Sequence, residues 1–151
     1  MQWTQKETDL LKDLKGQEQL CVDKYTRHAE AAADPQLKNL FSQLAQNEQQ
    51  HLQTIRQMEQ GTVPQMSGGS CNLQAPSFTA AYSGDSKEKQ NDCFLCSDVL
   101  AGEKHVSALY DTCVFEFKDG AARNVLSRIQ QEEQQHGKML FDYMQANGMY
   151  Q

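Results

Sequence analysis

The chain has 151 residues, a usual length for one hydrophobic core, and we predict a single domain spanning residues 1–151. Its 14 basic and 20 acidic residues give a net charge of −6, and because no basic cluster is present we expect no nucleic-acid partner. No apolar run approaches the roughly 20 residues of a membrane span, and the N-terminus lacks the pattern of a signal peptide, so we expect no membrane partner and a cytoplasmic location.

Two helices are predicted in the first half of the chain. The first begins near Thr4, which forms a capping box with Glu7, and ends near Ala33. Its inward stripe consists of Leu11, Leu14, Cys21, Val22, Tyr25 and Ala29. Asp34 and Pro35 then predict the N-cap and first residue of a second helix, antiparallel to the first because the turn is tight. The inward stripe of this helix consists of Leu37, Leu40, Phe41, Leu44, Leu52, Ile55 and Met58.

Residues 61–84 are rich in glycine, serine and proline and show no periodicity. This segment is too long for a hairpin turn, so we predict a crossover between two helical hairpins at 4–60 and 85–147. One hypothesis for Phe78 and Tyr82 is that they fold back as a lid over one end of the helices.

Two further helices are predicted after the crossover. Asp85 and Glu88 predict a capping box for the third helix, which Lys118-Asp119-Gly120 ends. Its inward stripe consists of Leu95, Val99, Leu100, Val106, Tyr110, Val114 and Phe117. The last helix runs from about 121 to 145, and Asn147-Gly148 ends it. Its inward residues are Val125, Leu126, Ile129, Leu140, Tyr143 and Met144.

The two predicted hairpins are related by an internal duplication. A shift of 85 positions, without a gap, aligns identical residues in both halves: Asp13 with Asp98, Glu18 with Glu103, Tyr25 with Tyr110, Asp34 with Asp119, Asn39 with Asn124, and Ser42 with Ser127. We therefore predict an all-α fold: a four-helix bundle made of two duplicated helical hairpins joined by a long crossover.

The duplication also aligns the two copies of the sequence Glu-Gln-Gln-His, at 48–51 and 133–136. Residues three apart lie on one face of a helix, so each copy directs a carboxylate and an imidazole to the same place. Glu18 and Glu103 each lie thirty positions before the glutamate of a copy, which places them level with it on an antiparallel helix. The predicted metal ligands are therefore Glu18, Glu48, His51, Glu103, Glu133 and His136.

The charge of this set explains why it would need metal. Four carboxylates in an apolar core repel one another and become protonated unless cations neutralise them. Oxygen and imidazole ligands suit iron or manganese, so two Fe ions or two Mn ions are the expected cofactors. The competing interpretation is that the histidines are ordinary core residues and that the motif recurs by accident in a glutamine-rich chain.

Other polar residues near these positions allow two interpretations. Tyr25 and Tyr110 follow Glu18 and Glu103 by seven residues. They either serve the site, by donating hydrogen bonds to ligand carboxylates or relaying an electron, or act as core aromatic residues. Cys21 is either a redox partner of the site or a small buried apolar residue. The five cysteines, with one isolated Cys93-x-x-Cys96, are expected to be reduced thiols. We expect His28 and His105 to be peripheral, and solvated faces to hold Glu30, Glu116 and Glu132.

The six ligand positions, equally spaced in both halves, resemble the ferritin-like di-iron carboxylate superfamily over nearly the whole chain. The resemblance implies a ferritin-like bundle in which Glu48 and Glu133 bridge two metal ions that react with dioxygen or hydrogen peroxide. The chain departs from rubrerythrins, which carry a further carboxylate at the position of Val106 and a rubredoxin-like pair of CxxC motifs. Cage-forming ferritins usually continue into a fifth helix, whereas this sequence stops at Gln151.

The C-terminal half also resembles the coat F family of bacterial spore coat proteins. The likeness comprises Asp98, Leu100, Lys104, Tyr110, Arg123 and His136, together with the final FDYMQANGMY. It implies a sporulating bacterium, a location in the spore coat and other coat proteins as partners.

These observations lead to three functional hypotheses. The first is a di-iron or di-manganese centre that reacts with dioxygen or peroxide, with catalase-like or peroxidase-like activity left open. The second is a structural coat protein whose metal only stabilises the bundle. The third is iron storage or detoxification, which would need assembly into a large shell. A homodimer is also left open.

Overall fold

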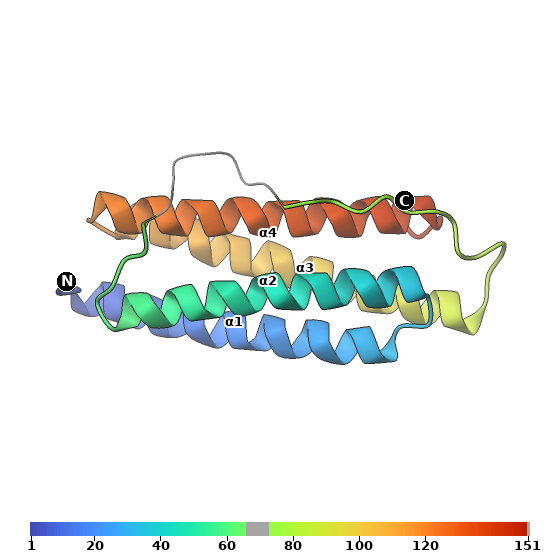
Figure 1. Cartoon of the computed structure of the whole chain (residues 1–151), viewed down its shortest axis with the longest axis horizontal. Coiled ribbons are helices and arrows are strands. Elements are labelled where there is room, and N and C mark those ends of the chain that lie inside the picture. The colour runs from blue at the N-terminus through green and yellow to red at the C-terminus, as the bar shows by residue number, and fades with distance from the viewer. Residues whose placement is uncertain (66–72, 151) are drawn as a thin grey trace.

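The computed structural model describes residues 1–65 and 73–150, and within these residues every regular element is a helix. The prediction of four helices is confirmed: α1 spans Gln5–Ala31, α2 Pro35–Glu59, α3 Lys87–Glu116 and α4 Gly120–Ala146. Figure 1 shows α1 and α2 as one antiparallel hairpin and α3 and α4 as another, with residues 73–86 running alongside α4 toward the start of α3. None of these helices combines the length and the apolarity that crossing a membrane requires.

Side chains that bond to free backbone groups set the helix boundaries. The capping box at α1 is present: Glu7 N donates to Thr4 Oγ1 over 3.1 Å, and Thr4 N donates to Glu7 Oε1 over 2.8 Å. The equivalent residues Asp34 and Asp119 are the N-caps of α2 and α4. The prediction for α3 was wrong by one residue. Its N-cap is Ser86, whose hydroxyl accepts from Lys89 N, while the Asp85 carboxylate accepts from Ser86 N instead.

Two glycines complete helix ends. Gly61 follows α2 with φ of +89°, and Gly148 follows α4 with φ of +65°. This left-handed conformation is strained for residues with a Cβ, and it lets the chain turn away after the last helical hydrogen bonds. The predicted end at Asn147-Gly148 is therefore confirmed, with Asn147 as the C-cap.

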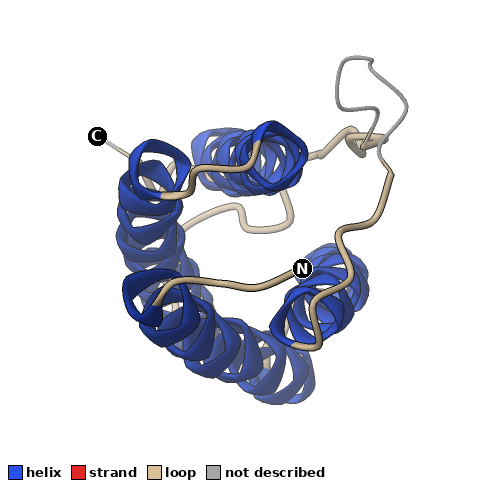
Figure 2. Cartoon of the chain, turned by 90° about the vertical axis from the view of Figure 1, so that its left-hand side faces the viewer, coloured by secondary structure: helices blue, strands red, loops and turns tan. Residues whose placement is uncertain are grey.

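The apolar core consists of two clusters at opposite ends of the bundle. One cluster joins the end of α1 and start of α2 to the start of α3 and end of α4, and includes Phe41 and Tyr143. The other joins the opposite ends of the same helices and includes Leu14 and Phe117. Figure 2 shows the four helices end-on around the common interior that these clusters fill. Five residues of the predicted inward stripes are only half-buried, because they lie at the edges of the helix contacts: Cys21, Val22, Ala29, Leu100 and Val114.

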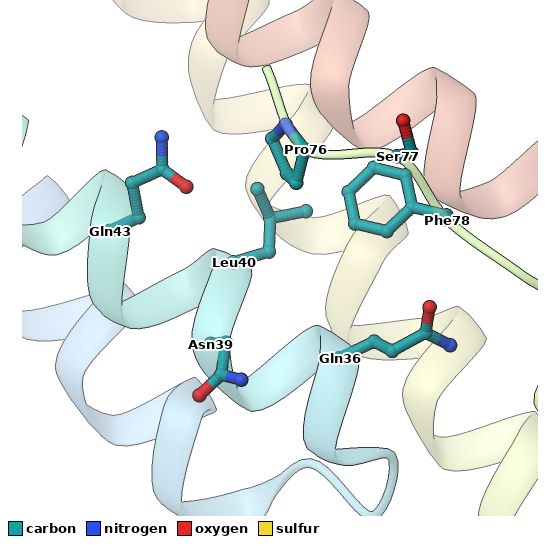
Figure 3. A pocket seen from close by; sticks show the side chains of 7 residues that line it. All are labelled: Gln36, Asn39, Leu40, Gln43, Pro76, Ser77 and Phe78. Carbon is teal, nitrogen blue, oxygen red and sulfur yellow. The ribbon is translucent and has the colours of Figure 1, made fainter. Parts of the chain in front are cut away.

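The described part of the crossover lies over the seam between α2 and α4. Gln43 Nε2 of α2 donates to Gln74 O, and the Phe78 ring packs edge-on against Tyr143 of α4 with 5.3 Å between centroids. Pro76 and Phe78 lie over Leu40 and help to line a pocket of about 180 Å³ (Figure 3). The Tyr82 hydroxyl donates to Asp92 Oδ2 over 2.6 Å. Phe78 and Tyr82 thus fold back onto the bundle, while residues 66–72 of the predicted crossover lie outside the described part.

Candidate metal centre

The six predicted ligands all project into the interior, one or two from each helix. Glu18 comes from α1 and Glu103 from α3, while α2 and α4 each supply a glutamate and a histidine. Exposure is 0% for Glu18, Glu48, Glu133 and His136 and 3% for His51 and Glu103. The polar side chains therefore form one layer between the two apolar clusters, and these clusters keep water from both sides of it.

The six side chains divide into two overlapping groups. One contains Glu18, Glu48, His51 and Glu133, and the other contains Glu48, Glu103, Glu133 and His136. In each group the potential ligand atoms lie within 4.8 Å of one another. Glu48 and Glu133 belong to both groups, so each could offer one oxygen to either of two neighbouring ions.

Both imidazoles turn the same nitrogen toward the carboxylates. His51 Nδ1 lies 2.7 Å from Glu48 Oε1, 2.8 Å from Glu133 Oε1 and 3.4 Å from Glu18 Oε2. His136 Nδ1 lies 3.2 Å from Glu103 Oε1 and 3.7 Å from Glu48 Oε1. The two rings stack with 5.8 Å between centroids. In each ring, Nδ1 is therefore the atom that could bind metal.

Several carboxylate oxygens in this layer have no hydrogen-bond donor among the described residues. They include both oxygens of Glu18 and Oε2 of Glu48, Glu103 and Glu133. Buried carboxylate oxygens are costly unless hydrogen bonds, charge partners or metal ions compensate them. The donor set of carboxylates and imidazoles fits two iron or manganese ions, and four carboxylates would balance the charge of two divalent cations.

The pKa values of the glutamates show that burial and mutual repulsion oppose the simultaneous ionisation of all four carboxyl groups when no metal is bound. Burial and repulsion from Glu48 raise the pKa of Glu18 from 4.5 to about 7. Burial, with Glu103, Glu48 and Glu18 nearby, raises the pKa of Glu133 well above 4.5. Burial also opposes ionisation of Glu48, but hydrogen bonds from Glu133 and His51 outweigh it and lower the pKa of Glu48 to about 2. Protons therefore neutralise part of the cluster when metal is absent.

In the two histidines, burial and the neighbouring carboxylates act on the pKa in opposite directions. Burial lowers the pKa of His51, but the surrounding carboxylates, first Glu132 and Glu133, outweigh it and raise the pKa well above 6.5. Burial lowers the pKa of His136 as well, but the carboxylates, first Glu103, outweigh it and raise the pKa of His136 above 6.5. Metal binding would need these protons to leave, because a ligand imidazole is neutral at the coordinating nitrogen.

Asn47 and Glu132 form a second layer behind the histidines that the sequence interpretation missed. Glu132 was predicted on a solvated face, and this was wrong: His51 Nε2 lies 3.0 Å from Glu132 Oε1, and Asn47 Nδ2 donates to the same oxygen over 2.9 Å. His136 Nε2 lies 2.6 Å from Asn47 Oδ1. Burial raises the pKa of Glu132, but His51 and Asn47 outweigh it and lower the pKa.

A signal for this second layer was present in the sequence. Asn47 and Glu132 are equivalent positions in the duplication, and each lies four residues before a histidine on the same helix face. The contacts, however, cross between the halves. They depend on how closely α2 approaches α4. A pocket of about 160 Å³ at this seam is lined by Asn47, Leu73 and His136 among others, so the second layer is the part of the site nearest to the surface.

The two predicted tyrosines differ from each other. The Tyr25 hydroxyl donates to Glu103 Oε1 over 2.7 Å, so Tyr25 contacts a ligand candidate of the other hairpin. The Tyr110 hydroxyl is buried near Glu18 but has no hydrogen-bond partner among the described residues. Burial and neighbouring carboxylates raise the pKa of both tyrosines well above 10. The donor interpretation therefore holds for Tyr25 only.

The remaining candidates lie outside the ligand layer. Cys21 is half-buried, and burial together with Glu48 and Glu18 raises its pKa, so its thiol stays protonated. Cys93, Cys96 and Cys113 are also free thiols, while Cys71 lies outside the described residues. His28 is half-buried, with Nε2 2.8 Å from Asp98 Oδ2, and belongs to neither group of candidate ligands, while His105 is exposed. The exposed positions predicted for Glu30 and Glu116 are confirmed.

Comparisons with known proteins find likeness in the second hairpin. No curated protein and no solved structure matches the chain significantly. A family model does match: residues 91–151 match the Coat F domain. The matched region includes Glu103, Glu133 and His136, whereas Glu18, Glu48 and His51 lie before it. The C-terminal half of the chain is therefore similar to the Coat F domain.

Proposed function

We propose that this chain is a metal-binding protein related to spore coat proteins, with a ferritin-like bundle that holds two iron or two manganese ions. The observation that carries the proposal is the pair of overlapping ligand groups that share Glu48 and Glu133 in the dry interior. The Coat F likeness supports the relation to the spore coat. Glu18 and His51 would complete one ion position, and Glu103 and His136 the other.

The bound ions would supply redox chemistry toward dioxygen or hydrogen peroxide. The protein would hold them through Glu48 and Glu133, which belong to both ligand groups. Tyr25 would keep one oxygen of Glu103 occupied by a hydrogen bond and so fix the direction of this carboxylate. The apolar clusters on either side exclude water and strengthen the electrostatic interactions within the layer.

Metal content tests the first part of this proposal. Protein expressed in medium with both iron and manganese should contain about two redox-active ions per chain, because the two ligand groups form two positions. A Glu48→Gln, Glu133→Gln variant should lose both ions, because each substituted residue serves both groups. The matched control is Glu30→Gln, Glu116→Gln, which removes two exposed glutamates from α1 and α3. Equal metal content in all three proteins would contradict the proposal.

Peroxide turnover separates the reactive centre from a structural one. If the ions are reactive, the loaded protein should convert hydrogen peroxide to water and dioxygen faster than the same concentration of free metal. The alternative is a structural coat protein in which metal only compensates the buried carboxylates. This alternative is favoured if metal loading raises the unfolding temperature and no peroxide turnover is found. Iron storage would require a large assembly, which the mass of the protein in solution would reveal.

A further inference from the structure

A chain of hydrogen bonds connects the outer nitrogens of the two ligand histidines across the seam between α2 and α4. His51 Nε2 faces Glu132 Oε1 at 3.0 Å, and the same oxygen accepts from Asn47 Nδ2 at 2.9 Å. Asn47 Oδ1 in turn faces His136 Nε2 at 2.6 Å. Asn47 is 8% exposed and both histidines are 3% exposed or less, so little water reaches these contacts. The other oxygen of Glu132, Oε2, lies 3.5 Å from Arg128 Nε.

The Glu132 carboxylate, between His51 and Asn47, sets the direction of every hydrogen bond in this series. An ionised carboxylate only accepts hydrogen bonds, so both groups that face Glu132 Oε1 must donate. His51 therefore carries its proton on Nε2, and Asn47 turns its amide nitrogen toward Glu132. Reversing the Asn47 amide would place Oδ1 against the carboxylate oxygen, and two acceptors at hydrogen-bond distance repel each other.

The orientation of Asn47 then determines the state of His136. With Nδ2 on Glu132, only Oδ1 remains for His136, and an amide oxygen only accepts. His136 must therefore carry its proton on Nε2 as well. In metal-free protein, Nδ1 of each ring can also carry a proton and donate it to the carboxylate that it faces. Metal binding would remove that proton, and the neutral ring would keep its proton on Nε2 and turn the Nδ1 lone pair toward the metal.

We propose that Glu132 is the positioning residue for both halves of the candidate metal centre, acting directly on His51 and through Asn47 on His136. This inference rests on the proposed metal-binding function and assigns roles to two residues outside the ligand set. The sequence duplication places Asn47 and Glu132 at equivalent positions, yet the two play different parts, because one carboxylate is enough to orient an amide that can serve the second ring. Two carboxylates at these positions would repel each other.

The test reads the protonated nitrogen of each histidine in protein loaded with zinc alone, by long-range ¹H–¹⁵N NMR. Wild-type protein should bind two zinc ions and show a proton on Nε2 of both His51 and His136. In Glu132→Gln, the new side chain can donate or accept, so Asn47 is no longer held in one orientation. Both histidines should then show altered Nε2 signals, and the affinity for both ions should fall by about 10- to 100-fold.

The Asn47→Ala variant separates the direct effect of Glu132 on His51 from its effect through Asn47 on His136. It should alter the NMR signals of His136, while His51 keeps its hydrogen bond to Glu132. The control is Gln50→Ala, which removes a different hydrogen bond of Asn47. Helix content and urea stability show whether each variant is folded. If two zinc ions bind but Glu132→Gln changes His51 only, the inference is wrong and the proposed function stands. If wild-type protein takes up no zinc, the proposed function and this inference fail together.

Discussion

Tyr25 and Tyr110 occupy equivalent positions in the two hairpins, yet their hydroxyl groups have different surroundings. Tyr25 donates to Glu103, and Tyr110 has no partner among the described residues. Both rings are fully buried, with exposures of 1% and 0%. The difference arises because the two halves are not identical in detail, and it makes the pair a matched test of one hydrogen bond.

Replacing each tyrosine with phenylalanine should have different effects on the stability of metal-free protein. Tyr25→Phe should lower the free energy of unfolding by about 1–3 kcal/mol, because a buried carboxylate loses a donor. Tyr110→Phe should leave it unchanged or raise it by about 1 kcal/mol, because no bond is lost and a buried hydroxyl is removed. Urea denaturation of both variants in the presence of a chelator measures the difference. Equal destabilisation by the two substitutions would contradict this prediction.

The ligand candidates themselves were predictable residue by residue. Helix geometry places residues three apart on one face, so the repeated Glu-Gln-Gln-His motif identified four of them, and the thirty-position offset identified Glu18 and Glu103. Glu132 was assigned to solvent because charged residues usually lie there. Its actual partners come from α2, and no pattern within α4 could reveal them.

At the level of helices, the equivalent aspartates Asp34 and Asp119 are the N-caps that directly precede α2 and α4. Each caps its own helix by accepting from a backbone N–H, of Gln36 and Ala122 respectively. Asp34 has a further role, since Oδ2 also accepts from the buried Tyr143 hydroxyl over 2.6 Å. The first cap therefore connects α2 to α4, while the second acts locally.

Replacing these aspartates with alanine should cost different amounts of stability. Asp119→Ala should lower the free energy of unfolding by about 1 kcal/mol, the usual value for an N-cap. Asp34→Ala should cost about 2–3 kcal/mol, because the Tyr143 hydroxyl is also left without an acceptor. Urea denaturation measures both variants.

A double variant provides the control. Adding Tyr143→Phe to Asp34→Ala should cost less than the sum of the two single substitutions, because both remove the same hydrogen bond. Strict additivity would show that the bond between Asp34 and Tyr143 contributes little.

Helix boundaries were predictable where a local signal was unambiguous. Thr4 with Glu7, and Asp34 with Pro35, satisfy several requirements of a helix start at once. At α3, Asp85 and Ser86 are adjacent and both are good N-cap residues, so sequence alone could not choose between them. The structure chose Ser86, which left the Asp85 carboxylate to accept from Ser86 N and Gln90 Nε2.

At the scale of the whole molecule, a layer of buried charges separates two apolar clusters. In metal-free protein, Glu18 and Glu133 titrate above their usual pKa, and so do His51 and His136. All four groups bind more protons in the folded state than in the unfolded state near neutral pH. Stability falls as pH rises wherever the folded state binds more protons.

The metal-free protein should therefore lose stability as pH rises from about 5 to 8. The increase in the pKa of Glu18, from 4.5 to about 7, alone corresponds to roughly 3 kcal/mol. Glu48 acts in the opposite sense only below pH 4.5, because its pKa is lowered to about 2. Unfolding temperatures at several pH values with a chelator would measure the trend, and stability that increases with pH would contradict it.

Under the proposed function, metal should reverse this trend, because it would replace protons in the same layer. Loaded protein should be more stable than metal-free protein, and the gain should increase with pH because binding releases protons. The Glu48→Gln, Glu133→Gln variant is the control and should show no gain from metal. An equal gain at pH 5 and pH 8 would show that metal binds elsewhere.

The sequence by itself determined the four helices, their order in two hairpins and the six residues that face one another, because these follow from periodicities within single helices and from the duplication. Only the tertiary structure decided which atoms meet across helices. It brought Glu132 and Asn47 behind the histidines and placed Tyr25 on a carboxylate of the other hairpin. These contacts depend on the spacing and rotation of packed helices, which side chains throughout the core set together.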